Sequence, residues 1–298
     1  MRYREFCGRR VSEIGFGGWV VGSDLYPLDD DAARALVKKA VDLGINFFDT
    51  ADVYGRGRSE ELLGRWLAGY DVVISTKVGY DFYSGGKPER RFDPPYLEMA
   101  AARSAERLGR RPNLLMIHNP TTRQVREAAP WLRSRRGAVA DCVGAALGPE
   151  TDVLEQGLAA LEEGLDAIMY VFNILERHPG AELTARGRGR GLLVRVPDAT
   201  GVLTDRFNPA PEGHRTLRPR EWLLKARAVV EREVAPLARE LGLTLGQYAV
   251  KYLLSHPITT VFVTATTPDE LEEYAAASDG KPLPPDHLER LASIHLPN

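Results

Sequence analysis

Short apolar runs typical of β-strands alternate along the chain with longer segments whose apolar residues recur at helical spacing. The runs predict strands at Gly15–Gly17, Asn46–Asp49, Val72–Lys77, Leu114–His118, Val139–Gly144, Ala167–Phe172, Leu192–Arg195 and Thr260–Val263. The amphipathic segments predict helices at about Asp30–Leu43, Glu60–Leu67, Pro94–Leu108, Thr122–Arg133, Thr151–Glu163, Ala181–Gly187, Leu245–Ser255 and Pro268–Ala277. This alternation predicts an α/β fold, a closed (β/α)8 TIM barrel.

Two segments fall outside the repeat. Arg2–Phe6 and Arg10–Ile14 flank a Cys7-Gly8 turn, which predicts an N-terminal β-hairpin, and an extra outer helix is expected at about Arg220–Leu241. A doubly wound sheet would carry a Gly-rich phosphate turn after its first strand, but Gly15–Trp19 lacks that spacing and leads into no immediate helix. With no linker in the sequence, residues 1–298 are expected to form one barrel domain.

Composition narrows the range of partners. Lys and Arg total 39 against 41 Asp and Glu, a net charge of −2, which gives no reason to expect binding to nucleic acid or a membrane. No apolar run approaches the roughly 18 residues of a membrane span, and a cytoplasmic location is expected. Cys7 and Cys142 lie far apart and in no metal-ligand spacing, so two reduced thiols and no metal site are expected.

Two long loops, Gly79–Pro95 and Val196–Pro219, follow the third and seventh strands. They belong to the C-terminal face of the barrel, where barrel enzymes place their sites. Aromatic residues that follow the first and third strands on this face are candidates for substrate contact: Trp19, Tyr26, Tyr80, Phe82 and Tyr83. A small molecule is therefore the expected binding partner, and the oligomeric state stays open.

Four polar residues lie at or just beyond the ends of strands two, three and four. Asp49 follows Phe47-Phe48, Tyr54 lies five residues later, Lys77 ends one apolar strand and His118 ends the next. An ionisable side chain at such a position is costly unless it is paired. Because neighbouring strand ends point toward one spot, we expect the four side chains to meet there; a core ion pair of Asp49 with Lys77 is the structural alternative.

Around these residues the sequence resembles the aldo-keto reductase family, in its bacterial and archaeal form. The resemblance is carried by Asn46–Gly55 with Ser59-Glu60, by Ser75–Val78 and by Ile117–Pro120, and it extends over essentially the whole chain. It implies that Asp49, Tyr54, Lys77 and His118 are a catalytic tetrad. It also implies an NADP(H)-dependent oxidoreductase acting on small aldehydes or ketones.

The chemistry of the residues agrees with that implication. A carbonyl that receives a hydride becomes an alkoxide and needs a proton donor in an electropositive pocket. Tyr54 would act as this acid or base, and a buried Lys77, held by Asp49, is expected to lower the pKa of the tyrosine. His118 is expected to donate a hydrogen bond to the substrate oxygen.

The positions that would hold the cofactor depart from the family. By resemblance they are Gly17, Asp49, Ala146, Met169, Arg195, Gly201, Leu203, Arg206, Thr266 and Thr267. The family commonly has Gly-Val-Ser-Asn where this chain has Gly144–Leu147, Gln at Met169 and Tyr at Arg195. Thr200–Arg206 resembles the segment that wraps the pyrophosphate.

The usual clamp for a 2′-phosphate is also missing, because no Lys or Arg lies between Lys251 and Lys281. NAD(H) is therefore the alternative to NADP(H). Acidic Asp269 and Glu270 would weaken the binding of an anion there, or could instead favour a ribose hydroxyl. Thr266, Thr267 and the following helix N-terminus could still bind an anion.

Two further hypotheses stay open. One is a barrel enzyme that performs proton-transfer chemistry without a nicotinamide. The apolar residues Ala146, Leu147 and Met169, at positions where the family holds the cofactor, favour this hypothesis. The other is a cofactor-sensing regulatory or binding subunit, similar to accessory subunits of ion channels. No role is assigned to the remaining histidines, which are His178, His214, His256, His287 and His295.

Overall fold

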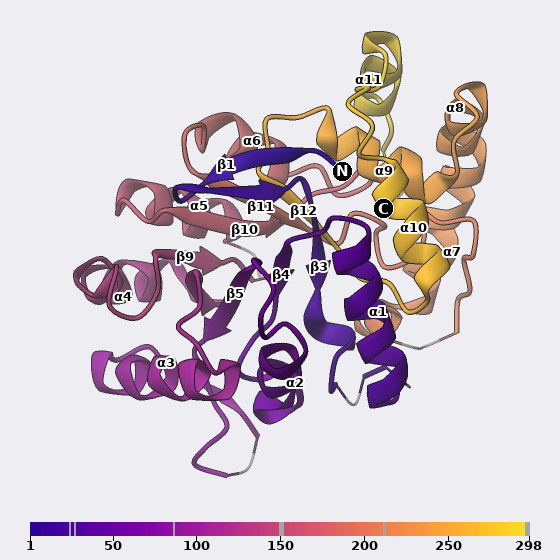
Figure 1. Cartoon of the computed structure of the whole chain (residues 1–298). Helices are drawn as coiled ribbons and strands as arrows, with labels where there is room; N and C mark the ends of the chain where they lie inside the picture. The colour runs from indigo at the N-terminus through magenta and orange to yellow at the C-terminus, as the bar shows by residue number, and fades with distance from the viewer. Residues whose placement is uncertain (24, 27, 86, 149–151, 211–212, 296–298) are drawn as a thin grey trace.

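The structure, a computed structural model, describes residues 1–23, 25–26, 28–85, 87–148, 152–210 and 213–295. Its central feature is a closed barrel in which every neighbouring pair of strands is parallel (Figure 1). The barrel strands are β3 (Ile14–Gly17), β4 (Phe47–Asp49), β5 (Val73–Val78), β8 (Leu114–His118), β9 (Cys142–Ala146), β10 (Ala167–Val171), β11 (Gly191–Arg195) and β12 (Thr260–Val263). The predicted (β/α)8 barrel is confirmed.

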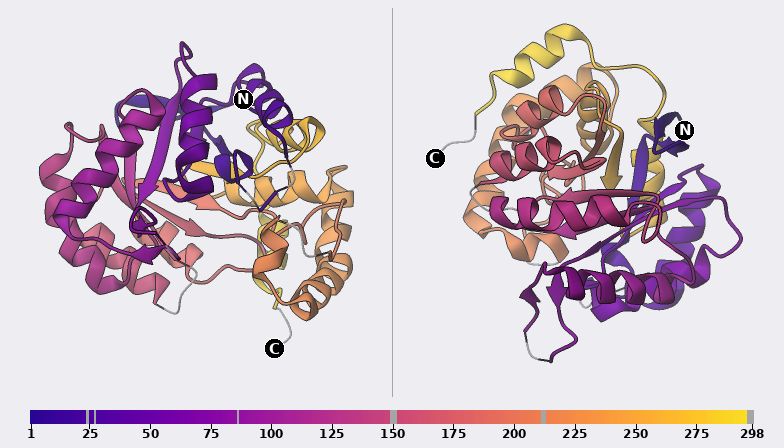
Figure 2. Two further views of the ribbon diagram at one scale, coloured as in Figure 1. Left: turned by 90° about the horizontal axis from the view of Figure 1, so that it is seen from below. Right: turned by 90° about the vertical axis from the view of Figure 1, so that its left-hand side faces the viewer.

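Helices surround the barrel on its outside (Figure 2). They are α1 (Asp30–Asp42), α2 (Arg58–Trp66), α3 (Pro94–Leu108), α4 (Thr122–Arg135), α5 (Val153–Glu162), α6 (Gly180–Arg186), α9 (Leu245–Leu254) and α10 (Pro268–Ala276). Each agrees with a predicted helix to within about two residues; the predicted start at Thr151 lies outside the described residues. Helix α1 shows why: Asp29 accepts a 2.8 Å hydrogen bond from the Ala32 amide, and the helix buries its apolar face.

The core has two parts because strand side chains alternate between the two faces of a sheet. The larger part lies between the strands and the helices. The smaller part fills the barrel and consists mainly of Phe47, Val73, Leu114, Met116, Ala146, Ala167, Met169, Leu193 and Phe262. The barrel is thus packed below its C-terminal mouth, which leaves that mouth for a site.

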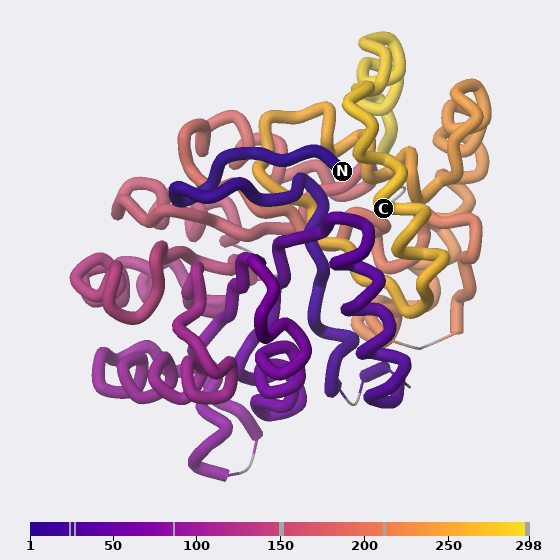
Figure 3. The backbone as a smooth tube through the Cα atoms, viewed as in Figure 1, coloured from indigo at the N-terminus to yellow at the C-terminus, as the bar shows by residue number. Residues whose placement is uncertain are grey.

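The N-terminal hairpin of β1 (Tyr3–Phe6) and β2 (Arg9–Ser12) lies across the opposite end of the barrel (Figure 3). Phe6 packs on Phe47, with ring centroids 5.8 Å apart. Gly191 at the start of β11 lies directly against Phe6, so that a larger residue there would collide with the ring. The hairpin therefore closes the N-terminal end of the barrel.

The prediction of two reduced thiols is wrong. The hairpin turn brings Cys7 to the first residue of β9, and Cys7 and Cys142 form a disulfide with Cα atoms 6.3 Å apart. The prediction rested on a sequence separation of 135 residues. That separation says nothing about proximity once the hairpin folds back beneath the barrel.

Other elements differ from the prediction in detail. The long outer helix is three pieces, α7 (Arg220–Val229), a π-helical turn (Val230–Val234) and α8 (Ala235–Glu240). The loop after β5 contains a small hairpin of β6 (Tyr80–Asp81) and β7 (Glu89–Arg90), and a further helix, α11 (Pro285–Ala292), follows the repeat. Strand β9 begins three residues later than predicted, because Ala140 forms a bridge with Arg136 instead.

Candidate active site

The four residues expected to form a tetrad line one pocket at the C-terminal mouth. Asp49 ends β4, Lys77 lies in the last part of β5, His118 ends β8 and Tyr54 begins a short 3-10 turn, η2 (Tyr54–Gly57). Because β4, β5 and β8 are adjacent in the barrel, their ends converge. The structure thus brings together the residues that the sequence pattern selected.

A buried ion pair forms the base of this pocket. Lys77 is 2% exposed, and its Nζ donates to Asp49 Oδ2 at 2.5 Å and to the Thr50 carbonyl at 2.7 Å. Ser75 Oγ donates to the other Asp49 oxygen at 2.7 Å. The Lys77 ammonium lies 5.0 Å from the centre of the Tyr54 ring. The ammonium is therefore fixed in place beside the phenol.

The two members of the pair shift each other's pKa. Burial raises the pKa of Asp49, and the Lys77 charge and hydrogen bond oppose part of that rise. Burial lowers the pKa of Lys77, but the Asp49 carboxylate and Tyr54 raise it by more, so it ends above its ordinary value. Lys77 is consequently an ammonium at neutral pH.

The pKa of Tyr54 differs in direction from the sequence-based expectation. Burial raises it above its ordinary value, and although Lys77 and Arg195 lower it, they do not reverse the effect of burial. The expectation of a lowered pKa considered only the charge of Lys77 and left out desolvation. At neutral pH Tyr54 is therefore a protonated phenol, and the neighbouring ammonium opposes part of the rise in its pKa.

His118 lies in an aromatic corner. Its ring centre is 6.0 Å from that of Tyr54 and 5.1 Å from that of Tyr80, edge to face in both cases. Burial, together with the charges of Lys77 and Arg195, holds its pKa well below the ordinary value. Within the described part of the chain its Nδ1 is buried without a hydrogen-bond partner. His118 is a neutral imidazole at pH 7 and can donate one hydrogen bond from its ring.

The wall of the pocket includes a histidine that the sequence analysis left without a role. Trp19 stacks on Tyr54 with ring centres 5.5 Å apart, and His214 lies edge-on to Trp19 at 4.4 Å. His214, in η3 (Gly213–Leu217), also shares a hydrogen bond with the Tyr26 hydroxyl. The length of the loop after the seventh strand pointed to this region, but nothing in the sequence distinguished His214 within it.

Of the other aromatic residues predicted to contact the substrate, one lies beside His118 and two lie outside the tetrad pocket. Tyr80 accepts a 3.0 Å hydrogen bond from Asn119, next to His118. The β6–β7 hairpin instead directs Phe82 and Tyr83 toward α3, where the Tyr83 hydroxyl accepts from Arg107 at 3.1 Å. Phe82 and Tyr83 thus lie outside the tetrad pocket, because the predicted loop has a hairpin of its own.

Several positions that resemblance assigns to the cofactor also line the tetrad pocket: Gly17, Ala146, Met169 and Arg195. Arg195 donates to the Leu147 carbonyl at 2.9 Å. Ala146 and Met169 contribute only apolar surface.

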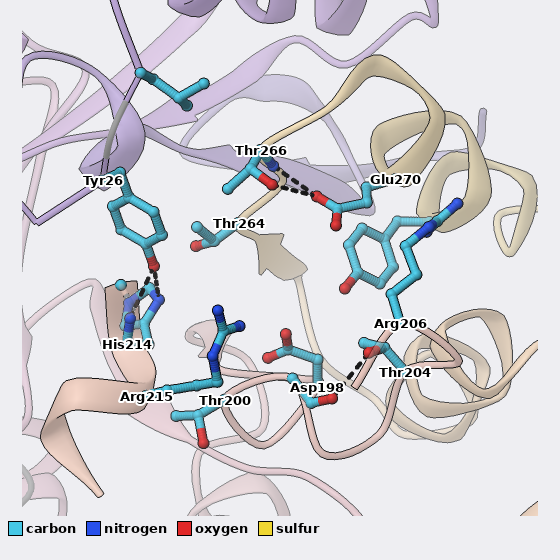
Figure 4. Close-up of a pocket in the computed structure, with 14 residues that line it drawn as sticks. Tyr26, Asp198, Thr200, Thr204, Arg206, His214, Arg215, Thr264, Thr266 and Glu270 are labelled. Atoms are coloured by element: carbon cyan, nitrogen blue, oxygen red, sulfur yellow. Dashed lines mark hydrogen bonds between the residues drawn. The ribbon is translucent and has the colours of Figure 1, made fainter. Parts of the chain in front are cut away.

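A second pocket adjoins the first, and both are lined by Asp198, His214 and Thr264 (Figure 4). Of the positions that resemblance assigns to the cofactor, Gly201, Arg206 and Thr266 line this pocket, whereas Leu203 is fully buried in the core. Thr267 is instead the N-cap of α10. The two pockets together form a continuous groove from the tetrad to α10, which we call the long groove.

Two of the carboxyl groups that line the long groove were not among the residues assigned to the cofactor by resemblance. Asp198 lies where the two pockets meet, and burial raises its pKa to about 6. Glu270 lines the far end. The sequence analysis considered Glu270, with Asp269, for its effect on an anion or a ribose hydroxyl. It passed over Asp198, because the burial of Asp198 depends on how the loop after β11 folds.

Comparison with known proteins agrees with this geometry. The model of the aldo/keto reductase family matches residues 13–295. A probable voltage-gated potassium channel subunit beta of Arabidopsis thaliana is 29% identical over 316 residues, covering 95% of this chain and 93% of the relative. L-glyceraldehyde 3-phosphate reductase of Escherichia coli K12 is 29% identical over 313 residues, covering 93% and 87%.

Among solved structures, the holo form of an aldo-keto reductase from Bacillus halodurans superposes with a TM-score of 0.81 at 25% identity, covering 98% of this chain and 95% of that one. The barrel, the site at its mouth and these relatives define an oxidoreductase. The chain belongs to the aldo/keto reductase family.

None of the helices in the described ranges is both long and apolar enough to cross a membrane. Over the same ranges, no group of three or more His, Cys, Asp or Glu side chains is arranged to hold a metal ion.

Proposed function

We propose that this protein transfers a hydride between a nicotinamide dinucleotide and the carbonyl or alcohol group of a small aldehyde or ketone, with Tyr54 as general acid and base. The observation that carries the proposal is the placement of Tyr54, Lys77, Asp49 and His118 around one pocket, with Lys77 fixed by Asp49 beside the phenol. The similarity to a reductase of a small phosphorylated aldehyde supports this substrate class.

The long groove fits an extended dinucleotide with its nicotinamide at the tetrad. Arg195 lines the inner pocket and Arg215 lines the outer one, where their guanidinium N–H groups suit a diphosphate. Thr200 and Thr204 also line the outer pocket, but their hydroxyls donate to backbone carbonyls. Ala146 supplies no side-chain hydrogen bond to a carboxamide, so the ring would be held mainly by apolar contact. When bound, the nicotinamide supplies or accepts the hydride.

The chain's own residues would manage the proton. The substrate oxygen accepts hydrogen bonds from the Tyr54 hydroxyl and the neutral His118 ring, which orient the carbonyl. As negative charge develops on that oxygen, Tyr54 transfers its proton to it, and the Lys77 ammonium stabilises the phenolate that remains. Asp49 holds Lys77 in position throughout. Because Tyr54 can give a proton to the substrate oxygen or take one from it, the direction of transfer depends on which substrate is present.

Replacing Tyr54 by Phe tests the proposal. Turnover of small aldehydes with NADPH or NADH should fall about 10²- to 10⁴-fold, the usual contribution of a positioned acid. The dissociation constant of the cofactor should change by less than about 3-fold, because the ring and its stacking on Trp19 are kept. Tyr83→Phe, outside the pocket, should leave turnover unchanged. A Y54F variant with full activity would overturn the role of Tyr54.

A second candidate is a cofactor-sensing regulatory subunit, favoured by the similarity to a probable potassium channel beta subunit. It predicts a wild-type protein that binds NADPH or NADH tightly yet turns over no aldehyde, ketone or alcohol. Proton-transfer chemistry without a nicotinamide, suggested by Ala146 and Met169, predicts that neither cofactor binds below millimolar concentration.

A further inference from the structure

The long groove continues from the tetrad in one direction, toward α10. Asp198, His214 and Thr264 line both of its halves, so a molecule that extends from one half enters the other between these residues (Figure 4). Thr266, Glu270 and the tyrosine ring of Tyr274 bound the far end. A dinucleotide with its nicotinamide at the tetrad therefore places its adenosine ribose beside these residues.

The backbone donors at this far end are already engaged. A single oxygen of Glu270 accepts from the Thr266 amide at 2.7 Å, from the Thr266 hydroxyl at 3.0 Å and from the Thr267 amide at 3.3 Å. These amides lie at the N-terminus of α10, where a phosphate would otherwise be favoured. The carboxylate of Glu270 takes the place that a 2′-phosphate would need.

The charges around the far end point the same way. Asp198, where the two pockets meet, adds a second carboxyl to the lining of the groove that leads to this end. Arg206 lines the groove too, but it forms an ion pair with Glu273, which also accepts from the Thr244 hydroxyl at 2.6 Å. Arg215 lies nearer the middle of the groove and donates to the Ala210 carbonyl at 2.8 Å (Figure 4). It could contact the diphosphate that both cofactors share, and so would not distinguish them.

We propose that this protein selects NAD(H) over NADP(H), and that Glu270 is the residue that determines the choice. The spare lone pairs of its carboxylate accept from the ribose 2′-hydroxyl, and its charge repels a 2′-phosphate in the same place. This inference rests on the proposed function for the placement of the cofactor. It replaces the NADP(H) that family resemblance alone would imply.

The experiment measures dissociation constants of four ligands: NADH, NADPH, ADP-ribose and 2′-phospho-ADP-ribose. The last two lack the nicotinamide and test the adenosine end of the groove apart from any hydride transfer. The wild type should bind the ligand without the 2′-phosphate at least about 10-fold more tightly in each pair, the effect of roughly 1.4 kcal/mol of discrimination.

Glu270→Gln is the informative variant, because glutamine keeps the capping box of α10 and removes only the charge. It should lower the dissociation constants of NADPH and 2′-phospho-ADP-ribose about 10-fold and change that of NADH by less than about 3-fold. Glu272→Gln, on the outer side of the same helix and paired with Lys39, is the matched control and should leave all four constants unchanged.

The outcomes separate the two proposals. Tighter binding of NADPH than of NADH by the wild type overturns the inference and leaves the proposed function standing. An unchanged ratio in E270Q overturns the role of Glu270. If NADH and NADPH fail to bind while ADP-ribose binds in preference to its 2′-phosphate, the proposed function fails and the selectivity of the groove is upheld.

Discussion

Asp198 lies where any dinucleotide in the long groove would have to pass. Burial, with a smaller contribution from the charge of Glu270, raises the pKa of this carboxyl to about 6 against the backbone amides that lower it. A carboxyl of this kind is neutral below pH 6 and negatively charged above it. The diphosphate of a cofactor is negative throughout, so repulsion between the two appears only as the pH rises through about 6.

We therefore expect NADH to bind about 3- to 10-fold more tightly at pH 5 than at pH 7.5, with a proton taken up on binding. Asp198→Asn should remove this dependence, because its amide stays neutral over the whole range. Quenching of tryptophan fluorescence at a series of pH values provides the measurement. Asp269→Asn, an exposed residue at the start of α10, should behave as the wild type does. An equal pH slope in D198N would contradict the prediction.

The site residues that could be predicted from the sequence are those at the ends of strands. Asp49, Lys77 and His118 end apolar runs, and the geometry of a parallel barrel alone requires such residues to converge. Asp198 and His214 lie in a long loop whose path no periodicity determines. The direction of the Tyr54 pKa shift could not be predicted from the sequence either, because it is the balance of desolvation against the neighbouring charges of Lys77 and Arg195.

At the scale of elements, the contact of α2 with α3 depends on the absence of a side chain. A Cβ placed on Gly64 would lie 2.6 Å from the carbonyl oxygen of Leu108, in the last turn of α3. Backbone cannot move aside as a flexible side chain can. The two helices pack this closely just outside β4 and β5, which carry Asp49 and Lys77.

Gly64→Ala should lower the free energy of unfolding by about 1–3 kcal/mol, the usual cost of overpacking, although alanine is the better helix former. Chemical denaturation followed by circular dichroism would measure it. Glu61→Ala, on the exposed side of α2, is the control and should change stability by less than about 0.5 kcal/mol. A stabilised G64A protein would show that the helices separate easily.

Most elements followed from the hydrophobic pattern, since each barrel strand is a short run buried on both faces and each outer helix buries one face. The exceptions have local causes. Pro236 has no amide hydrogen to donate to the preceding turn, so the long predicted helix widens at Val230–Val234 and restarts as α8. Helix α11 is short and buries only His287 and Leu291 completely, too few positions to show a period. The β6–β7 hairpin pairs two residues on each strand, below what alternation can reveal.

At the scale of the whole molecule, the Cys7–Cys142 disulfide joins the hairpin that closes the barrel to the barrel wall. Replacing both cysteines by serine should lower the free energy of unfolding by about 2–4 kcal/mol under oxidising conditions. A reductant should bring the wild type to the stability of the double variant and leave the variant unchanged. A wild-type denaturation midpoint that ignores the reductant would show that the bond does not stabilise the fold.

The same bond gives the chain the topology of a ring with a tail. The ring closes between Cys7 and Cys142 and contains the barrel strands β3, β4, β5 and β8 with all four residues of the tetrad. Asp198 and Glu270 both belong to the tail. A backbone cut in the loop between β5 and α3 would open the ring without releasing either piece, so Tyr54 and His118, on opposite sides of the cut, would still belong to one covalent molecule.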